Sequence, residues 1–253
     1  MARLQEIVSY TNDLLRVDEF RDYCPNGLQV EGKSVVNHIV MGVTASQALL
    51  DQAIAQQADA ILVHHGYFWK GEHEAITGIK KKRLQALLQQ DINLLAYHLP
   101  LDTHRDLGNN AQLAQVLGLI DVSCIEQGKM KGLLWQGRLE PALTPASLSR
   151  HLNDCLQHQP LFLDGGHQGE IATIAWCTGA AQGYIEAAAE LGVDAYISGE
   201  ISEQTTHQSR ELGVHYFAAG HHATERYGVQ ALGKHLAEKF QLSCEFIDCP
   251  NPV

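Results

Sequence analysis

The stretch from residue 39 to residue 66, IVMGVTASQALLDQAIAQQADAILVHHG, decides the fold of this chain. It opens with an apolar run typical of a strand, continues through a segment with apolar residues at helical spacing, and closes with a second apolar run. The pattern predicts a strand, a helix and a strand, the unit from which parallel sheets are built. His64 and His65 then lie at the end of the second strand.

A second stretch repeats this unit. Residues 174–201, IAWCTGAAQGYIEAAAELGVDAYISGEI, superpose on residues 39–66 without a gap after a shift of 135 positions, from residue 39 to residue 174. The identical pairs are Ile39 and Ile174, Ala45 and Ala180, Gln47 and Gln182, Ala53 and Ala188, Asp59 and Asp194, and Ala60 and Ala195. General likeness between α/β units would explain a few matches, but the repeated order of elements favours an internal duplication.

The repeat extends to two further apolar runs that end in histidine. Residues 92–98 (INLLAYH) and 214–221 (VHYFAAGH) both predict buried strands. In each case a carboxylate follows the final histidine by four residues, Asp102 in the first run and Glu225 in the second. Amphipathic helices precede the unit in both parts of the chain. The sequence therefore predicts two similar α/β halves.

The two halves are expected to be residues 1–126 and 127–253. The boundary lies in a polar stretch with two glycines and no apolar periodicity, SCIEQGKMKG at 123–132. Strands that alternate with helices predict sheets with helices on both faces and ligand sites at the carboxyl ends of the strands. The chemistry is therefore expected after Val63 and Tyr97.

Composition narrows the class of protein. The chain has 253 residues, 45% hydrophobic and 19% charged, which suffices for a full buried core. Its formal charge of -11 argues against nucleic acid as a partner. The first twenty residues carry four acidic side chains and lack the apolar core of a signal peptide, and no apolar run predicts a membrane span. Six cysteines without a C-x-x-C pair are typical of reduced thiols, so we expect a cytoplasmic protein.

The pair His64 and His65 is the first candidate for metal binding. Adjacent side chains on a regular strand point to opposite faces of the sheet. Both imidazoles reach one site only where the pleat breaks, and Gly66 gives the chain freedom to turn there. Two metal ions side by side satisfy this pair more easily than one. The alternative interpretation is a solvated strand end.

Three more side chains follow strand ends. Asp102 leaves a strand that Pro100 stiffens by fixing φ. His221 and Glu225 are four residues apart, so on a helix both project from one face and can chelate one ion. The alternative for this pair is an exposed contact that contributes roughly 0.2 to 0.5 kcal/mol. With the histidine pair, these residues give the three imidazoles and two carboxylates of a carboxylate-bridged two-metal site.

Such a site predicts two divalent metal ions per subunit. Imidazole and carboxylate ligands suit Zn, Fe, Mn and Ni alike. Glu200, which the duplication aligns with His65, is the candidate general base, or else accepts a hydrogen bond from a ligand histidine. His98 is a ligand, a group that supports the ligands, or a proton shuttle, and we favour the supporting role. Since Glu200 and His98 could each move a proton, they are the candidate catalytic residues.

Six stretches carry a family resemblance. They are DYCPNGLQVEG (22–32), MGVTASQALLDQAI (41–54), DAILVHHGYFWKG (59–71), YHLPLD (97–102), LGNNAQLA (107–114) and AAGHHATERYG (218–228). They closely resemble the bacterial branch of the NIF-three-like family, dinuclear-metal-centre proteins labelled type 2 GTP cyclohydrolase I homologues. The resemblance implies two similar, intertwined α/β halves, two metal ions and a ring-shaped homohexamer. The ligands that it implies are His64, His65, Asp102, His221 and Glu225.

The sequence therefore favours a metal-dependent hydrolase that acts on a small molecule. A nucleotide, a pterin-like ring or another cyclic amide is the expected substrate class, as the resemblance suggests. The competing hypothesis is a non-catalytic metal-binding protein that regulates or scaffolds other proteins, since eukaryotic members of the family are partners of transcription factors. One departure from the family is Gly66, where many relatives have proline.

Overall fold

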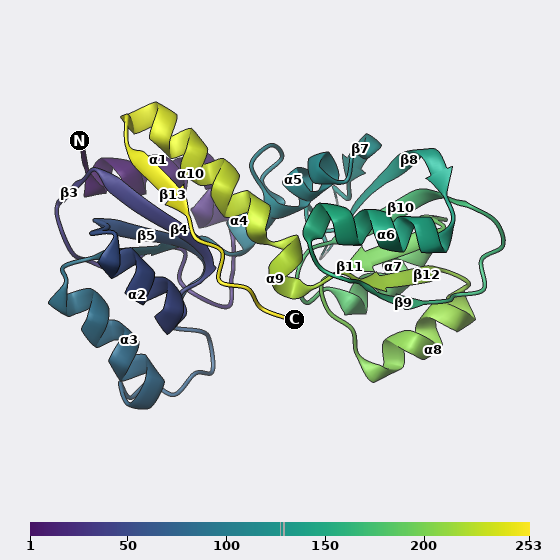
Figure 1. Ribbon diagram of the computed structural model, residues 1–253, viewed down its shortest axis with the longest axis horizontal. Coiled ribbons are helices and arrows are strands. Elements are labelled where there is room, and N and C mark those ends of the chain that lie inside the picture. Colours follow the sequence, from purple (N-terminus) through teal and green to yellow (C-terminus); the bar gives the residue numbers. More distant parts are fainter. Residues whose placement is uncertain (127, 129) are drawn as a thin grey trace. The chain divides into compact units, whose positions relative to one another are not determined.

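The computed structural model describes the whole chain except Gln127 and Lys129, and it divides into two compact units (Figure 1). Unit 1 comprises Met1–Gly108 and Gly228–Cys249, and unit 2 comprises Asn109–Tyr227 and Pro250–Val253. The expected boundary between the halves, at residue 127, lies outside the described residues. Within the described part, no helix is both long enough and apolar enough to cross a membrane.

Unit 1 contains a five-stranded sheet in the order β13-β4-β5-β6-β2. Its strands are β2 (Gly27–Val30), β4 (His38–Thr44), β5 (Ala60–His65), β6 (Asn93–Ala96) and β13 (Ser243–Phe246). The strands β13, β4, β5 and β6 run parallel, and β2 pairs antiparallel with β6 at the edge. A separate two-stranded ladder joins β1 (Ala2–Arg3) to β3 (Val35–Val36). The expected parallel strand-helix-strand unit is therefore present.

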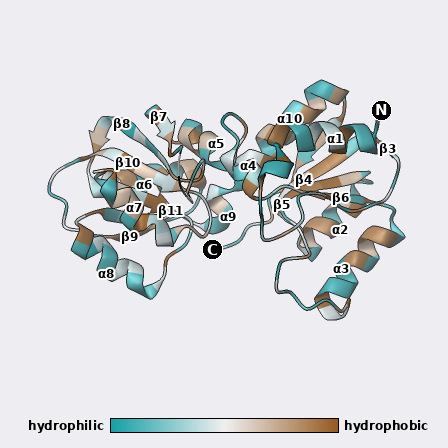
Figure 2. Ribbon diagram, turned by 180° about the vertical axis from the view of Figure 1, so that it is seen from behind, coloured by the Kyte–Doolittle hydropathy of each residue, from teal (hydrophilic) through white to brown (hydrophobic). Residues whose placement is uncertain are grey.

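Helices cover both faces of this sheet. They are α1 (Leu4–Leu15), the 3-10 helix η1 (Val17–Glu19), α2 (Gln47–Ala55), α3 (Gly78–Gln89), α4 (Leu99–Thr103) and α10 (Arg226–Phe240). Side chains alternate along a strand, so Ile39 and Met41 pack with α1 and α10 while Val40 packs with α2 and α3. The strand β4 is accordingly coloured as hydrophobic along most of its length in Figure 2. Both faces of the sheet are buried.

Unit 2 contains a six-stranded sheet in the order β7-β8-β10-β11-β12-β9. Its strands are β7 (Ile120–Cys124), β8 (Trp135–Leu143), β9 (Leu161–Leu163), β10 (Ile171–Cys177), β11 (Ala195–Ser198) and β12 (His215–Ala218). The central strands β10, β11 and β12 run parallel, and the outer strands pair antiparallel with their neighbours.

Helices also flank the second sheet. They are α5 (Asn109–Val116), α6 (Pro145–Leu156), the 3-10 helix η2 (Gln182–Tyr184), α7 (Ile185–Glu190), α8 (Glu203–Leu212) and α9 (His221–Thr224). The helices α5 and α6 share a core with Ile174, Trp176 and Phe217. The helix α7 packs with Tyr196 and Tyr216, whose side chains belong to the opposite face. The helix α6 is the amphipathic helix expected before the second unit, and the Thr144 side chain is its N-cap.

The strand registers support the duplication. Ile39 of β4 lies opposite Ala60 of β5, and Ile174 of β10 lies opposite Ala195 of β11. The partners in both pairs are related by the same shift of 135 positions. The predicted α/β fold with two similar halves is therefore confirmed.

The aspartates that match under the duplication also make matching hydrogen bonds. Asp59 accepts from the backbone N–H groups of residues 37 and 38. Asp194 accepts from the backbone N–H groups of residues 172 and 173, which are the same positions after the shift. In both units this carboxylate joins the start of one strand to the start of the next.

The units are not the same segments as the sequence halves. The helix α10, from the second half, packs in unit 1, where Val229 and Leu232 join the core of β4 and α1. Gly233 lets this helix approach the sheet, since a Cβ there would collide with Sδ of Met41. The helix α5, from the first half, belongs to unit 2. The division into 1–126 and 127–253 stays a proposal about the duplication.

Candidate metal centre

His64 is a buried imidazole with a defined proton position. Its side chain is fully buried, and its Nδ1 lies 2.9 Å from the carbonyl oxygen of Tyr97. Because a carbonyl only accepts, Nδ1 is the donor, and in the neutral ring Nε2 carries the lone pair. That nitrogen lies 3.4 Å from Oδ1 of the buried Asp102. The lone pair on Nε2 and the carboxylate oxygen repel each other at this separation. A cation shared by the two atoms, either a proton or a metal ion, would stabilise the pair.

His65 lies beside His64, with ring centroids 4.5 Å apart. Its Nδ1 is 3.2 Å from the hydroxyl of Thr44, on the neighbouring strand β4. Gly66 follows without the left-handed conformation expected for a loose turn. A Cβ at this position would collide with the side-chain oxygen of Gln29 and lie 2.6 Å from Cβ of Ala96. The glycine is therefore required by close packing rather than by freedom to turn.

His98 and Asp102 lie at the carboxyl end of β6, the next strand. His98 is the N-cap of α4, and Asp102 follows one turn later with its backbone N–H donating to the His98 carbonyl. The ring of His98 lies 5.1 Å from that of His64. One nitrogen from each of His64, His65 and His98 lies within 4.8 Å of the others, close enough to hold a metal ion. Unit 1 thus gathers three imidazoles and the Asp102 carboxylate.

Unit 2 gathers one imidazole and two carboxylates. His221 begins α9, and its Nε2 lies 3.1 Å from Oε2 of Glu225, as the spacing of four residues predicts. Its Nδ1 lies 2.7 Å from Oε1 of Glu200. Burial by itself would lower the pKa of His221, but the hydrogen bonds and charges of Glu225 and Glu200 raise it to about 9. This cluster therefore attracts positive charge.

Backbone packing fixes the second cluster. Gly179, in the left-handed region with φ 69°, lies so close that a Cβ would collide with Oε1 of Glu225 and lie 3.1 Å from Nε2 of His221. A Cβ at Gly199 would lie 2.7 Å from Cα of His221. Sequence patterns did not identify either glycine as part of the cluster. Both allow the strand ends to approach the charged side chains.

All four cluster histidines share one arrangement at Nδ1. The partner is the Tyr97 carbonyl for His64, the Thr44 hydroxyl for His65, the Asp22 carboxylate for His98 and the Glu200 carboxylate for His221. Histidines that bind metals through Nε2 usually direct Nδ1 to such a group, which fixes the ring and its proton. The donor set of imidazoles and carboxylates therefore fits divalent transition metals.

A thiol lies near the first cluster. Cys24 is buried, and its Sγ lies within 4.8 Å of ligand atoms of Asp22 and His98. Burial and the charge of Asp22 raise the pKa of this thiol to about 12. It is therefore protonated at neutral pH, and a thiol is a poor metal ligand in that form. Asp22 itself was missed by sequence reasoning because it is 76 positions from His98, although it begins the DYCPNG stretch.

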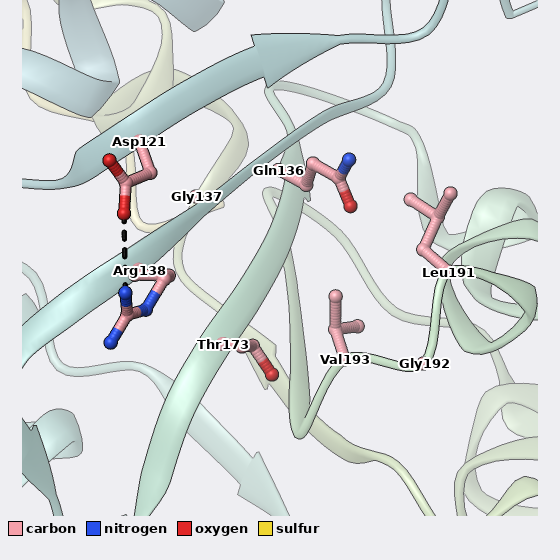
Figure 3. A pocket seen from close by; sticks show the side chains of 8 residues that line it. All are labelled: Asp121, Gln136, Gly137, Arg138, Thr173, Leu191, Gly192 and Val193. Carbon is pink, nitrogen blue, oxygen red and sulfur yellow. Dashed lines mark hydrogen bonds and ion pairs between the residues drawn. The ribbon is translucent and has the colours of Figure 1, made fainter.

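Two cavities of unit 2 lie at opposite ends of its strands. A cavity of about 430 Å³ at the carboxyl ends is lined by Glu200, Gly220 and His158. A smaller one of about 230 Å³ lies near Thr173, at the amino end of β10. It contains an exposed ion pair and none of the predicted site residues (Figure 3). Ligands of parallel sheets bind at the carboxyl ends, so the larger cavity is the candidate substrate pocket.

Comparison with known proteins gives consistent matches over the whole chain. The model of the family Duf34/NIF3 (NGG1p interacting factor 3) matches residues 2–252. A protein of Allochromatium vinosum named GTP cyclohydrolase 1 type 2 homolog is 55% identical over 253 residues, which is 100% of this chain and 98% of the relative. A protein of Pseudomonas aeruginosa with the same name is 54% identical over 250 residues, 99% of this chain and 98% of the relative.

Solved structures agree with this result. The structure of protein ybgI, described as of unknown function, has 49% sequence identity and a TM-score of 0.94, and the match covers all of both chains. A protein from Thermus thermophilus has 33% identity and a TM-score of 0.87, again over all of both chains. These identities show a common family as well as a common fold.

Proposed function

The chain belongs to the Duf34/NIF3 (NGG1p interacting factor 3) family, and from this premise we propose that it is a metal-dependent hydrolase with a two-metal centre. The proposed ligands of the two divalent ions are His64, His65, Asp102, His221 and Glu225. Zn, Fe, Mn or Ni would suit this donor set. Bound ions would supply Lewis acidity and a nucleophilic water at neutral pH.

One observation carries this proposal. In the three proposed ligand histidines, His64, His65 and His221, Nδ1 is hydrogen-bonded to an oxygen, as is usual for imidazoles that bind a metal through Nε2. The raised pKa of His221 supports it further, because the same negative charges that hold a proton there would hold a metal ion.

Glu200 and His98 are the residues proposed to handle protons. Glu200 lines the cavity of about 430 Å³, where its carboxylate would accept a proton from a bound molecule. Its hydrogen bond to His221 also supports a second role, in which it orients that imidazole. His98 lies beside His64 and His65, within reach of a molecule bound at the first cluster.

The proposed substrate is a small molecule, namely a nucleotide, a pterin-like ring or another cyclic amide. The relatives' name, GTP cyclohydrolase 1 type 2 homolog, suggests this class. The larger cavity of unit 2 has a volume typical of small-molecule sites, roughly 300 to 1,000 Å³. The net charge of -11 disfavours a nucleic-acid polymer as substrate.

Metal analysis combined with a substrate panel tests the proposal. Protein loaded with Mn, Fe or Zn should contain two ions per chain and turn over at least one nucleotide or pterin. Asp102→Ala should abolish turnover and reduce the metal content, whereas Asp121→Ala, which removes an exposed carboxylate, should change neither. Two bound ions without turnover, together with a reproducible co-purifying protein, would favour the alternative of a regulatory or scaffold protein. Fewer than two ions would contradict the two-metal centre.

The family resemblance also supports a homohexameric ring, and the six cysteines without a C-x-x-C pair support a location in the cytoplasm. Light scattering on the purified protein should then give a mass six times the 27.9 kDa of one chain. A monomeric mass at micromolar concentration would contradict the hexamer. Fractionation of the native host, with detection of the chain, tests the location.

A further inference from the structure

The DYCPNG stretch, which the proposed function leaves without a role, encloses His98. Oδ1 of Asp22 lies 2.8 Å from Nδ1 of the imidazole, and Oδ2 accepts from the backbone N–H of Leu99 at 2.9 Å. Oδ1 of Asn26 accepts from the backbone N–H of His98 at 2.7 Å. The Asn26 amide in turn donates to Oδ2 of Asp22 at 2.8 Å. Two side chains thus fix both the ring and the backbone at this position.

The contacts of Asp22 determine where the His98 ring carries its proton. The Asp22 side chain is 2% exposed, and both of its oxygens accept hydrogen bonds from N–H donors, including the backbone N–H of Tyr23. Burial would raise the pKa of this carboxyl, but the hydrogen bond and charge of His98 and the other donors hold the pKa below its usual value. An ionised carboxylate only accepts, so Nδ1 of His98 must donate.

Nε2 of His98 is then the nitrogen that can accept a proton. With the proton on Nδ1, the neutral ring carries its lone pair on Nε2. The ring lies 5.1 Å from His64, 5.7 Å from His65 and 5.1 Å from the edge-on indole of Trp69. These rings restrict the position of the imidazole on the side of the first cluster. Asp22 restricts it on the other side.

We propose that Asp22 is a positioning residue of the reaction: it holds His98 in the Nδ1–H form, so that Nε2 accepts a proton from the attacking water. This inference rests on the proposed hydrolysis. The water oxygen forms its new bond to the substrate while one of its protons moves to Nε2. The Asp22 carboxylate stabilises the resulting imidazolium, which then returns the proton to the leaving group as the scissile bond breaks.

Nitrogen NMR of the metal-free protein tests the proton position directly. In wild-type protein labelled with ¹⁵N at histidine, His98 should show a protonated Nδ1 and an unprotonated Nε2, with the signals assigned by their loss in His98→Gln. Asp22→Asn replaces an acceptor by an amide that can donate to Nδ1, so the proton should move to Nε2. Asp59→Asn, which alters another hydrogen-bonded carboxylate of unit 1, should leave the His98 signals unchanged.

Metal and kinetic measurements separate this role from a structural one. Asp22→Asn should keep the wild-type metal content, because neither Asp22 nor His98 is among the proposed ligands. On any substrate that the wild-type protein turns over, it should lower kcat by about 10²- to 10⁴-fold with little change in KM.

Several results would overturn the proposal. If His98 of the wild-type protein carries its proton on Nε2, the proposal is wrong. This result needs only the wild-type protein, so it holds even if Asp22→Asn fails to fold. An Asp22→Asn protein with unchanged His98 signals, or with unchanged kcat, would also contradict it. Loss of metal from both Asp22→Asn and His98→Gln would show that His98 is a ligand instead. Absence of turnover by the wild-type protein would contradict the hydrolase and the proton-acceptor role, and the NMR result would still decide the positioning.

Discussion

Equivalent strands of the two units are followed by different residues at their carboxyl ends. In unit 1 the strand β5 ends in His64 and His65, whereas the same positions after β11 in unit 2 are Gly199 and Glu200. The backbone registers coincide, so the difference lies in the side chains and in how closely the neighbouring chain packs. The two copies of the duplicated unit therefore share the backbone register of these strands, but only the copy in unit 1 has the pair of histidines.

The next strand shows a second difference, which corrects the sequence comparison. Spacing alone pairs His98 with His221, since each is followed by a carboxylate four residues later. Counted from the matched strand starts Asn93 and His215, however, His98 aligns with Gly220. His98 and Gly220 are also the N-cap positions of α4 and α9. His221 therefore has no histidine counterpart in unit 1.

These differences change the ratio of imidazoles to carboxylates in the two clusters. Unit 1 supplies three imidazoles and the Asp102 carboxylate, and the imidazoles are hydrogen-bonded to a carbonyl, a hydroxyl and a second carboxylate. Unit 2 supplies one imidazole between two carboxylates, Glu200 and Glu225. The two clusters therefore differ in their number of imidazoles, three in unit 1 and one in unit 2, whereas each contains two carboxylates. If both serve one dinuclear centre, neither should bind metal normally after the other is damaged.

The largest expected effect comes from removing a ligand in each cluster. His64→Ala and His221→Ala should each weaken metal binding by about 10²-fold or more. Loss of a metal ligand should cost more affinity than loss of a residue that only hydrogen-bonds to a ligand, for which a decrease of about 10- to 100-fold is typical. Calorimetric titration with Zn²⁺ measures this. His207→Ala removes a histidine from an exposed i, i+4 pair with Glu203 and should have no effect. Metal loss in only one of the two variants would show that the clusters act separately.

Gly199→Ala tests why unit 2 lacks the histidine pair. The added Cβ would press on the backbone of His221 and on the carbonyl of Gly179, each 2.7 Å away. We expect a loss of about 1 to 3 kcal/mol in the free energy of unfolding and weaker metal binding. Urea denaturation measures the first quantity. Gly183→Ala, with open space around its Cβ, is the matched control and should be close to wild type.

Glu200→Gln and Thr44→Val compare the charged partner of His221 with the neutral partner of His65. It should weaken metal binding by about 10- to 100-fold, and Thr44→Val should have a smaller effect. In the metal-free protein it should also lower the pKa of His221 from about 9. NMR titration of the His221 ring measures that pKa. Equal losses of metal affinity in both variants would contradict the difference between the clusters.

The same raised pKa predicts a pH dependence of stability. A group whose folded pKa lies above its unfolded value of about 6.5 stabilises the protein fully below that value, and this stability is lost as the pH rises through about 9. Glu200→Gln should therefore destabilise the metal-free protein more at pH 6 than at pH 9.5. Thermal unfolding at the two pH values measures the difference. A larger loss at pH 9.5 would refute the assignment of the charge to His221.

The smallest effect should be the same in both units. Asp59→Asn and Asp194→Asn each remove a carboxylate that accepts matching backbone hydrogen bonds, at a cost of about 1 kcal/mol. Hydrogen bonds lower the pKa of both carboxyls despite their burial, so this stability is present above pH 4 and lost as the pH falls through the lowered pKa. Urea denaturation at pH 7 and pH 3 should show it. Unequal losses at pH 7 would weaken the structural equivalence of the two units.

Much of the fold was predictable from the sequence. The shift of 135 positions identified the duplicated unit, and apolar runs bounded by polar residues located the central strands of both sheets. The i, i+4 spacing of His221 and Glu225 predicted their contact, because that spacing fixes a common face on one helical turn. These features depend on local geometry, which short stretches of sequence determine.

Tertiary structure decided which distant residues support the local ones. Asp22 reaches His98 across 76 positions, and α10 joins the core of unit 1 although it follows the second half of the duplication. Gly199 is required by a backbone that approaches it from another strand end. Such relations depend on how elements pack in three dimensions, and periodicity along the chain does not record them. The sequence by itself determined the repeated unit and the residue types at its strand ends, and the folded chain determined their hydrogen-bond partners.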